Sequence, residues 1–111
     1  MLNKFDFKSI SDTFTATGNG TTVDCSKQPV ESFGIQITST GGTPTLWTVV
    51  LEGSLDGTNF TTILTHTNIL GINVSLWSGA VLSPCLYFRS RVSVLTLGGA
   101  TNITATIIGK K

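Results

Sequence analysis

Apolar and polar residues alternate with a period of two along most of this chain, and this alternation restricts its fold more than any other feature. The pattern is clear at residues 13–17 and 32–38, where every second side chain is Thr, Ser or Gln, apart from a single Gly. A period of two is that of a β-strand with one face turned toward a core. No stretch shows a helical period, and the 19 Thr residues suit a half-buried sheet surface. The chain is therefore predicted to be all-β.

Turn signals divide the alternating stretches into about eight short strands. We expect these strands at residues 13–17, 22–26, 32–38, 47–55, 60–65, 72–77, 87–94 and 103–108. Glycine-rich turns such as Gly18-Asn19-Gly20 lie between them, and residues 79–84 are expected to form a loop. Short strands at regular spacing favour a sandwich or barrel over a parallel α/β sheet. The prediction is an antiparallel β-sandwich, either jelly-roll or Ig-like, with a short N-terminal arm.

The best-patterned segment, residues 47–64, predicts a hairpin that serves as a scaffold. Its inner face is expected to carry Trp47, Val49, Leu51 and Leu55. Asp56-Gly57 supplies the positive φ that tight hairpin turns require. Gly53 is expected to leave room for a bulky neighbour such as Trp47 or Phe60.

The first twelve residues depart from the regular alternation. Leu2, Phe5, Phe7 and Ile10 are apolar residues among charged ones. We therefore divide the chain into an N-terminal arm or edge strand at residues 1–12 and a single sandwich domain at residues 13–111. Two interpretations of the arm stay open. It packs on the core of its own domain, or it docks on a neighbouring subunit.

Charge is scarce in this sequence, which disfavours several classes of partner. Charged residues make up 12% of the chain and the net charge is +1. Nucleic-acid binding requires many phosphate contacts, so we expect no nucleic-acid partner. No run approaches the roughly 20 apolar residues of a membrane helix, and the N-terminus lacks the apolar centre of a signal peptide. We expect no membrane partner, synthesis in a cytoplasm, and two buried free thiols at Cys25 and Cys85.

The ionisable residues do not form a recognisable catalytic or ligand-binding pattern. His66 is the one histidine and has no Cys at the spacing of a zinc site. Of the six carboxylates, Glu52 is expected on the outer face of its strand and Asp56 in a turn, where they serve solubility and turn geometry. The segment Ser54–Asn59 lacks the spaced Asp series of a calcium loop. We therefore expect no catalytic residue, no metal and no cofactor.

Two features are candidate partner contacts. Arg89 and Arg91 share one strand face with Tyr87, and two like charges at alternate positions are not buried without partners. They lie on a solvated outer face, or they contact acidic groups of a partner protein. Trp77 is either an exposed interface aromatic or is covered by a loop or by the second sheet. Together with Phe5 and Phe7 of the arm, these four residues are the predicted contact residues.

The segment VVLEGSLDGTNFTTI resembles a signature of small β-sandwich modules from tailed-bacteriophage structural proteins. Those modules have a strand that ends in E-G-S-x-D-G-x-x-F/W, followed by a Thr-rich return strand. The later segments YFRSRVSV and TLGGATNITATIIG are similar to the arginine-bearing strand and final strand of the same modules. The match runs from about Trp47 to Gly109. The D-G-x-x-F/W motif also resembles discoidin-like carbohydrate-binding sandwiches, which are usually longer.

The phage resemblance implies a virion protein without enzymatic activity. A free-standing chain of this size suits a capsid decoration, or cement, protein that binds the outer capsid surface. Its implied partners are the major capsid protein or other virion proteins and further copies of itself, with a homotrimer favoured. Two alternatives stay open. One is a tail, neck or fibre-associated module, and the other is a carbohydrate-binding module with Trp77 and Tyr87 as an exposed aromatic pair.

Overall fold

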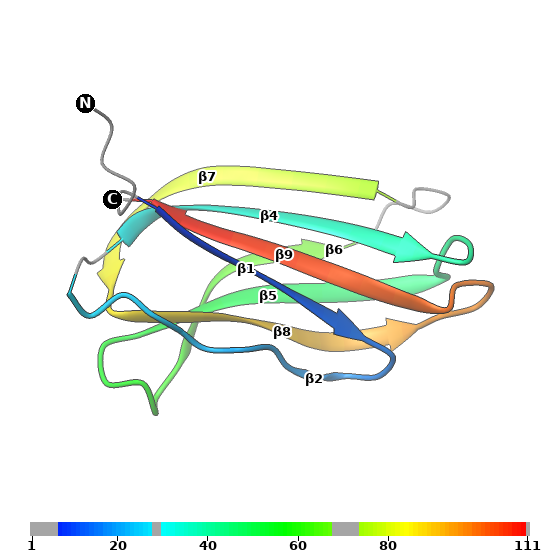
Figure 1. The fold of residues 1–111 in the computed structure, drawn as a ribbon, viewed down its shortest axis with the longest axis horizontal. Helices are drawn as coiled ribbons and strands as arrows, with labels where there is room; N and C mark the ends of the chain where they lie inside the picture. The colour runs from blue at the N-terminus through cyan, green and yellow to red at the C-terminus, as the bar shows by residue number, and fades with distance from the viewer. Residues whose placement is uncertain (1–6, 28–29, 68–73, 111) are drawn as a thin grey trace.

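A computed structural model shows an all-β molecule with two stacked sheets (Figure 1). It describes residues 7–27, 30–67 and 74–110, without the side chains of residues 7, 30–31, 74–84 and 110. No helix in this part of the chain is long and apolar enough to cross a membrane. The strands of the described residues are β1 (Phe7–Phe14), β2 (Gly18–Asn19), β3 (Val23–Asp24), β4 (Val30–Thr40), β5 (Leu46–Ser54), β6 (Thr61–Thr67), β7 (Val74–Cys85), β8 (Tyr87–Thr96) and β9 (Asn102–Lys110).

The order of the strands is that of a jelly roll. One sheet has the order β1-β9-β4-β7 and the other β2-β8-β5-β6, with β3 also paired to β8. Every pair is antiparallel. The partners are nested like a long hairpin that has been rolled up: β1 with β9, β2 and β3 with β8, β4 with β7, and β5 with β6. Since β2 and β3 are two parts of one strand position, the roll has eight positions, and the predicted antiparallel sandwich is confirmed.

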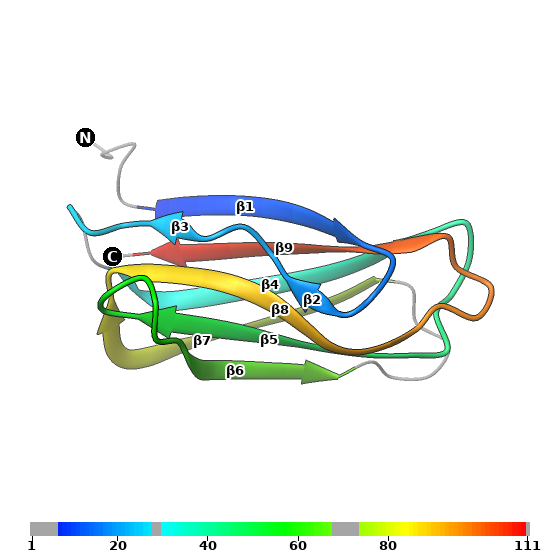
Figure 2. The same ribbon diagram turned by 90° about the horizontal axis from the view of Figure 1, so that it is seen from below.

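The core fills the space between the two sheets, which Figure 2 views nearly face-on, with β8, β5 and β6 in front of β4 and β7. Phe33 of β4 meets Phe88 of β8 edge to face, with ring centroids 5.7 Å apart. Each fully buried large side chain contributes roughly 1.5–3 kcal/mol relative to exposure. The alternation seen in the sequence places these residues on the inner faces, and the largest buried ones are Trp47, Phe88, Ile35, Ile37, Leu51, Ile103, Ile107, Val49 and Val92.

Several local expectations are wrong. Part of the turn expected at Gly18-Asn19-Gly20 is strand β2, which pairs with β8 as β3 does, whereas β1 pairs with β9 in the other sheet. Residues 79–84, expected as a loop, belong to β7, whose pairing with β4 shifts register between Val30 and Ser32. Leu55, expected on the inner face, is 68% exposed because β5 ends at Ser54.

Gly53 does leave room for a neighbour, but the neighbours differ from those expected. A Cβ at this position would lie 2.5 Å from Cδ1 of Ile63 and 3.2 Å from Cβ and Sγ of Cys85. Ile63 comes from β6 and packs against the core. Gly53 therefore allows Ile63 and Cys85, not Trp47 or Phe60, to approach the backbone of β5.

Residues 7–12, assigned by sequence to an arm or edge strand, form most of edge strand β1. The strand continues to Phe14 and pairs with β9 from Phe7↔Lys110 to Phe14↔Ile103. Ile10 packs against the core, and Asp12 accepts hydrogen bonds from the backbone N–H and hydroxyl of Thr21 at 2.9 and 2.7 Å. These contacts fasten β1 to the connection between β2 and β3. The possible boundary at residue 12 therefore lies inside one continuous strand.

Candidate functional site

Glu52, Arg89 and Arg91 form a cluster on the outer face of the β2-β8-β5-β6 sheet. The register of β5 and β8 places Glu52 opposite Arg89, and Val50 opposite Arg91. Their inward-facing neighbours Leu51 and Ser90 are completely buried. Alternation along both strands therefore turns the three charged side chains to the same outer face.

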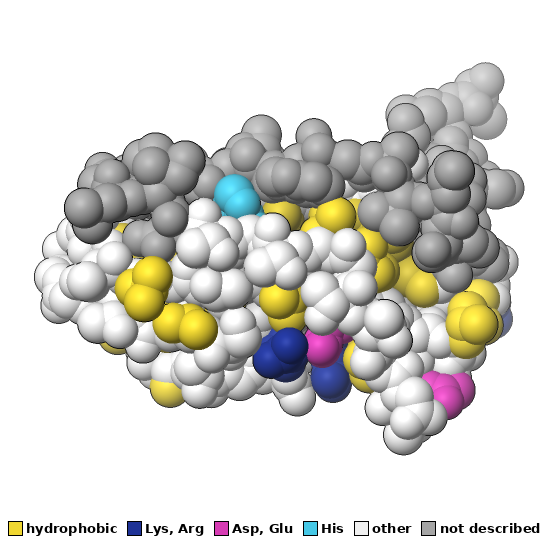
Figure 3. All heavy atoms as spheres, turned by 180° about the vertical axis from the view of Figure 1, so that it is seen from behind, with side chains coloured by type: hydrophobic (Ala, Val, Ile, Leu, Met, Phe, Trp, Pro, Cys, Tyr) yellow, Lys and Arg dark blue, Asp and Glu magenta, His cyan; other side chains and the backbone are white. Residues whose placement is uncertain are grey.

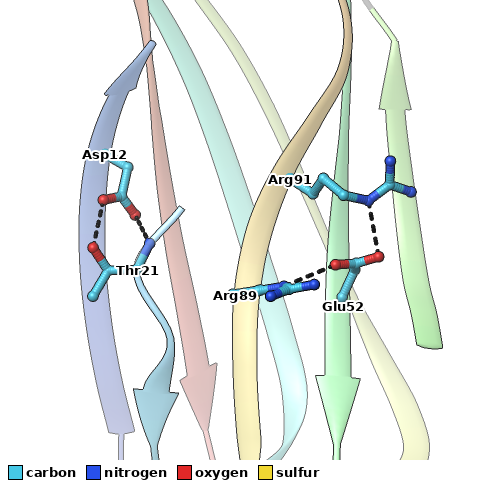
Figure 4. A network of polar contacts seen from close by, with 5 residues as sticks. All are labelled: Asp12, Thr21, Glu52, Arg89 and Arg91. Atoms are coloured by element: carbon cyan, nitrogen blue, oxygen red, sulfur yellow. Dashed lines mark hydrogen bonds and ion pairs between the residues drawn. The ribbon is translucent and has the colours of Figure 1, made fainter. Parts of the chain in front are cut away.

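One carboxylate holds both guanidinium groups (Figure 4). Nε of Arg89 donates to Oε1 of Glu52 at 3.0 Å, and Nε of Arg91 donates to Oε2 at 2.9 Å. The side chain of Glu52 is 8% exposed, whereas those of Arg89 and Arg91 are 21% and 36% exposed. The acidic group is thus at the base of the cluster, and both basic groups extend from it toward solvent.

The loop between β5 and β6 folds back over this face. The Arg89 guanidinium carbon lies 3.9 Å from the centroid of the Phe60 ring, in a cation–π arrangement. A Cβ at Gly57 would lie 3.5 Å from ring atoms of Tyr87, so the loop backbone lies close over that ring. Phe60 and residue 57 therefore fix the positions of Arg89 and Tyr87 from outside the sheet.

Asp56 organises this loop through hydrogen bonds to its carboxylate. Oδ1 accepts from the backbone N–H groups of Thr58 and Asn59, both at 2.8 Å, and from the hydroxyl of Ser54 at 2.9 Å. Oδ2 accepts from the side-chain amide of Asn59 at 2.7 Å. These bonds, first of all the backbone bond from Asn59, hold the pKa of Asp56 well below its usual range. Gly57 has the positive φ expected of it, 78°, but the connection is a six-residue loop and not a tight two-residue turn.

A space-filling view from behind shows charged side chains gathered at one place (Figure 3). In Figure 3, dark blue basic side chains lie beside a magenta acidic side chain on a surface that is mostly white.

On the opposite sheet, the outer face of β1 and β9 carries hydroxyl pairs. Ser11 bonds Thr106 at 2.7 Å, and Thr13 bonds Thr104 at 3.0 Å.

The structure brings three of the predicted contact residues together on one face. Tyr87, Arg89 and Arg91 share the outer face of β8. Phe7, at the start of β1, pairs with Lys110 of β9, and Trp77 of β7 pairs with Ile35 of β4. The side chains of Phe7 and Trp77 lie outside the described part. Phe5 lies outside the described residues altogether.

Sequence reasoning missed the role of Glu52. Its position on the outer face was predicted correctly. The prediction that it is solvated and serves solubility was wrong, because Glu52 is 6% exposed and binds both arginines. The acidic partner of the arginines thus lies in the same chain. The signal was the alternation itself, which turns Glu52, Arg89 and Arg91 outward, but only the pairing of β5 with β8 shows that they meet.

The histidine and the two cysteines contact other residues of the sandwich. The His66 ring is 5.1 Å from the Trp47 ring, and burial lowers its pKa. Cys25 and Cys85 are both buried, and Sγ of Cys25 donates to the carbonyl oxygen of Cys85 at 3.5 Å. Among the described residues, no three His, Cys, Asp or Glu side chains come together in a group that could hold a metal ion.

Comparison with known proteins shows likeness of fold without likeness of sequence. No protein-family model matches the chain, and no curated protein matches it. The structure is similar to the SPBc2 prophage-derived protein YomS, with 13% identity, a TM-score of 0.56 and coverage of 95% of both chains. PirA gives a TM-score of 0.49 at 10% identity, covering 94% of this chain and 93% of its own. VP2 of the infectious bursal disease virus subviral particle gives 0.45 at 13% identity, and 32% of that chain is covered.

Proposed function

We propose that this chain is a non-enzymatic structural protein of a bacteriophage virion, and that it decorates the outer surface of the capsid. The observation that supports this most is the fold likeness to the prophage-derived protein YomS, which extends over 95% of both chains. The likeness therefore extends over nearly all of the jelly roll. The resemblance of residues 47–109 to phage structural modules points in the same direction.

The bonds that the carboxylates make within the molecule also support a structural role. Asp12 joins two parts of the sandwich, Asp56 organises a loop, and Glu52 holds two arginines. Each carboxylate is already engaged in bonds that shape the surface. A protein whose ionisable groups are committed in this way suits binding through a rigid surface better than acid–base chemistry.

The size and shape of the sandwich support the decoration role. A single 111-residue sandwich with a largely uncharged surface presents two broad sheet faces. Contacts that are weak singly become firm when several are made together on a repeating lattice of capsid subunits. The proposed partner is the major capsid protein, and a homotrimer would place equivalent faces against neighbouring capsomers.

The test is a binding experiment with separated virion parts. Purified heads and purified tails of the phage that encodes this protein are incubated with the protein and sedimented, and its solution mass is measured by light scattering. Decoration predicts saturable recovery with heads and not with tails. Recovery with tails alone would identify a tail, neck or fibre component, and recovery with neither would contradict the virion proposal.

A further inference from the structure

We propose that Arg89 and Arg91, held in place by Glu52, form a binding site for a carboxylate side chain on the surface of a partner protein. The site itself is argued from the geometry of the cluster. That the carboxylate belongs to a capsid protein rests on the proposed function.

The cluster of Glu52, Arg89 and Arg91 retains hydrogen-bond donors that Glu52 does not use. Both arginines bind Glu52 through Nε, so the terminal nitrogens of each guanidinium group make no bond to Glu52. Among the described residues, no other hydrogen bond or ion pair to these nitrogens is present. Figure 4 shows the terminal nitrogens of Arg91 pointing away from Glu52. Two donor groups are therefore left for a further acceptor.

The cluster of Glu52, Arg89 and Arg91 carries a net positive charge. Two guanidinium groups and one carboxylate leave the cluster with a net charge of about +1. The described residues include no second carboxylate in ion-pair contact with either arginine. The charge that complements this cluster is negative, and a negative group brought to it would restore balance on a surface that is otherwise poor in charge.

The guanidinium groups of Arg89 and Arg91 are already held in place before any ligand binds. Arg89 is stacked on Phe60, and Arg91 lies opposite Val50, an outward-facing residue that is only 5% exposed. Glu52 fixes both groups from below. A guanidinium group that is already oriented loses little freedom on binding, and its planar fork matches the two oxygens of a carboxylate.

The low charge of the chain favours a protein carboxylate over a nucleic-acid phosphate as the ligand. Nucleic-acid binding depends on many basic side chains acting together, whereas the whole chain has seven Lys and Arg residues and a net charge of +1. Lys8, the basic side chain of β1, donates to the backbone oxygen of Asp24 at 2.6 Å. A site with two arginines alone fits one acidic side chain of a partner protein.

The test is a titration followed by NMR, which needs no virus particles. The 15N-labelled protein is titrated separately with acetylated hexaglutamate, acetylated hexaglutamine and inorganic phosphate, and the Nε–Hε resonances of Arg89 and Arg91 are followed. We expect saturable shifts of both resonances with hexaglutamate in the millimolar range and none with hexaglutamine. Absence of shifts with hexaglutamate would overturn the site. Saturation by phosphate at lower concentration than by hexaglutamate would overturn the choice of a carboxylate.

Matched variants separate the site from net charge. Arg91→Gln is expected to weaken hexaglutamate binding by about tenfold, and Arg91→Lys, which keeps the charge but loses the fork, by less. Lys27→Gln removes the same charge at an exposed position after β3 and is expected to bind as the unchanged protein does. Equal weakening by Arg91→Gln and Lys27→Gln would overturn the proposal. Failure of the head-binding experiment together with success of this titration would contradict the virion assignment and leave the site in place.

Discussion

Nε of Arg89 lies 3.0 Å from Oε1 of Glu52, although the two residues are 37 positions apart in sequence and belong to different strands. Arg91 bonds the other oxygen of the same carboxylate. Two arginines at alternate positions of one strand are thus kept together by a single, nearly buried acid.

Replacing Glu52 with Gln should destabilise the protein. The change leaves two neighbouring positive charges without their common partner, and we expect a loss of about 2 kcal/mol in the free energy of unfolding, less than for a fully buried pair because the arginines are partly exposed. Urea unfolding measures this. In the double variant Glu52→Gln with Arg91→Gln, one of the two repelling charges is gone, so the loss should be smaller than the sum of the single losses. Strict additivity would contradict the coupling.

Adding a methyl group at Gly53 should crowd the core. The new Cβ would lie 2.5 Å from Cδ1 of Ile63, and we expect Gly53→Ala to cost about 1–2 kcal/mol, since the side chain of Ile63 can shift but Cys85 also lies close. Ile63→Val removes the crowded atom. We therefore expect Gly53→Ala to cost less in an Ile63→Val background than in the unchanged protein. An equal cost in both backgrounds would show that Ile63 is not the obstacle.

The stability of the protein should depend on the ionisation of Asp56. Its pKa is held below the ordinary value of 3.8 in the folded protein, so the ionised carboxylate favours folding above that value, and this contribution is lost as the pH falls below it. Asp56→Asn has no such ionisation. Urea unfolding at about pH 7 and about pH 3 should show a smaller loss for Asp56→Asn than for the unchanged protein. Identical losses would contradict the assignment.

Two deletions at the N-terminus should distinguish the contribution of strand β1 to stability from that of the residues before it. Deleting residues 1–6 removes none of the β1–β9 pairs, which begin at Phe7, so we expect the free energy of unfolding to stay nearly the same. Deleting residues 1–10 removes four of these pairs together with Ile10, and we expect a loss of at least about 2 kcal/mol. Unchanged stability after the longer deletion would contradict the role of β1 as an integral edge strand.

The two thiols should be unreactive while the protein is folded. Cys25 and Cys85 are 1% and 4% exposed, and burial raises the pKa of Cys85 to about 11. Because the thiolate is the reactive form, we expect negligible labelling by a disulfide reagent at about pH 8 and labelling of both thiols in urea. Rapid labelling of the folded protein would show that this part of the core opens.

The fold class could be predicted from the sequence because it depends on local alternation. The inward positions of β4 and β9 follow directly from the period of two, as Ile35, Ile37, Ile103 and Ile107 show. The pairing of strands could not be predicted. In a jelly roll β1 meets β9 across nearly the whole chain, and no local pattern near Phe14 indicates Ile103 as its partner.

The candidate site could be predicted only in part, for the same reason. Alternation placed Arg89, Arg91 and Tyr87 on one face, but the partner of the arginines depends on the register between β5 and β8. The loop that brings Phe60 onto Arg89 depends on the hydrogen bonds of Asp56, whose geometry a turn motif does not specify. The shape of this surface is therefore set by contacts distant in sequence.

Sedimentation with separated phage heads and tails tests the central claim most directly. The account predicts that the protein pellets with heads in a saturable manner and stays in solution with tails, and that Arg91→Gln reduces its occupancy on heads while Lys27→Gln does not. A protein that remains in solution with both heads and tails would contradict the account.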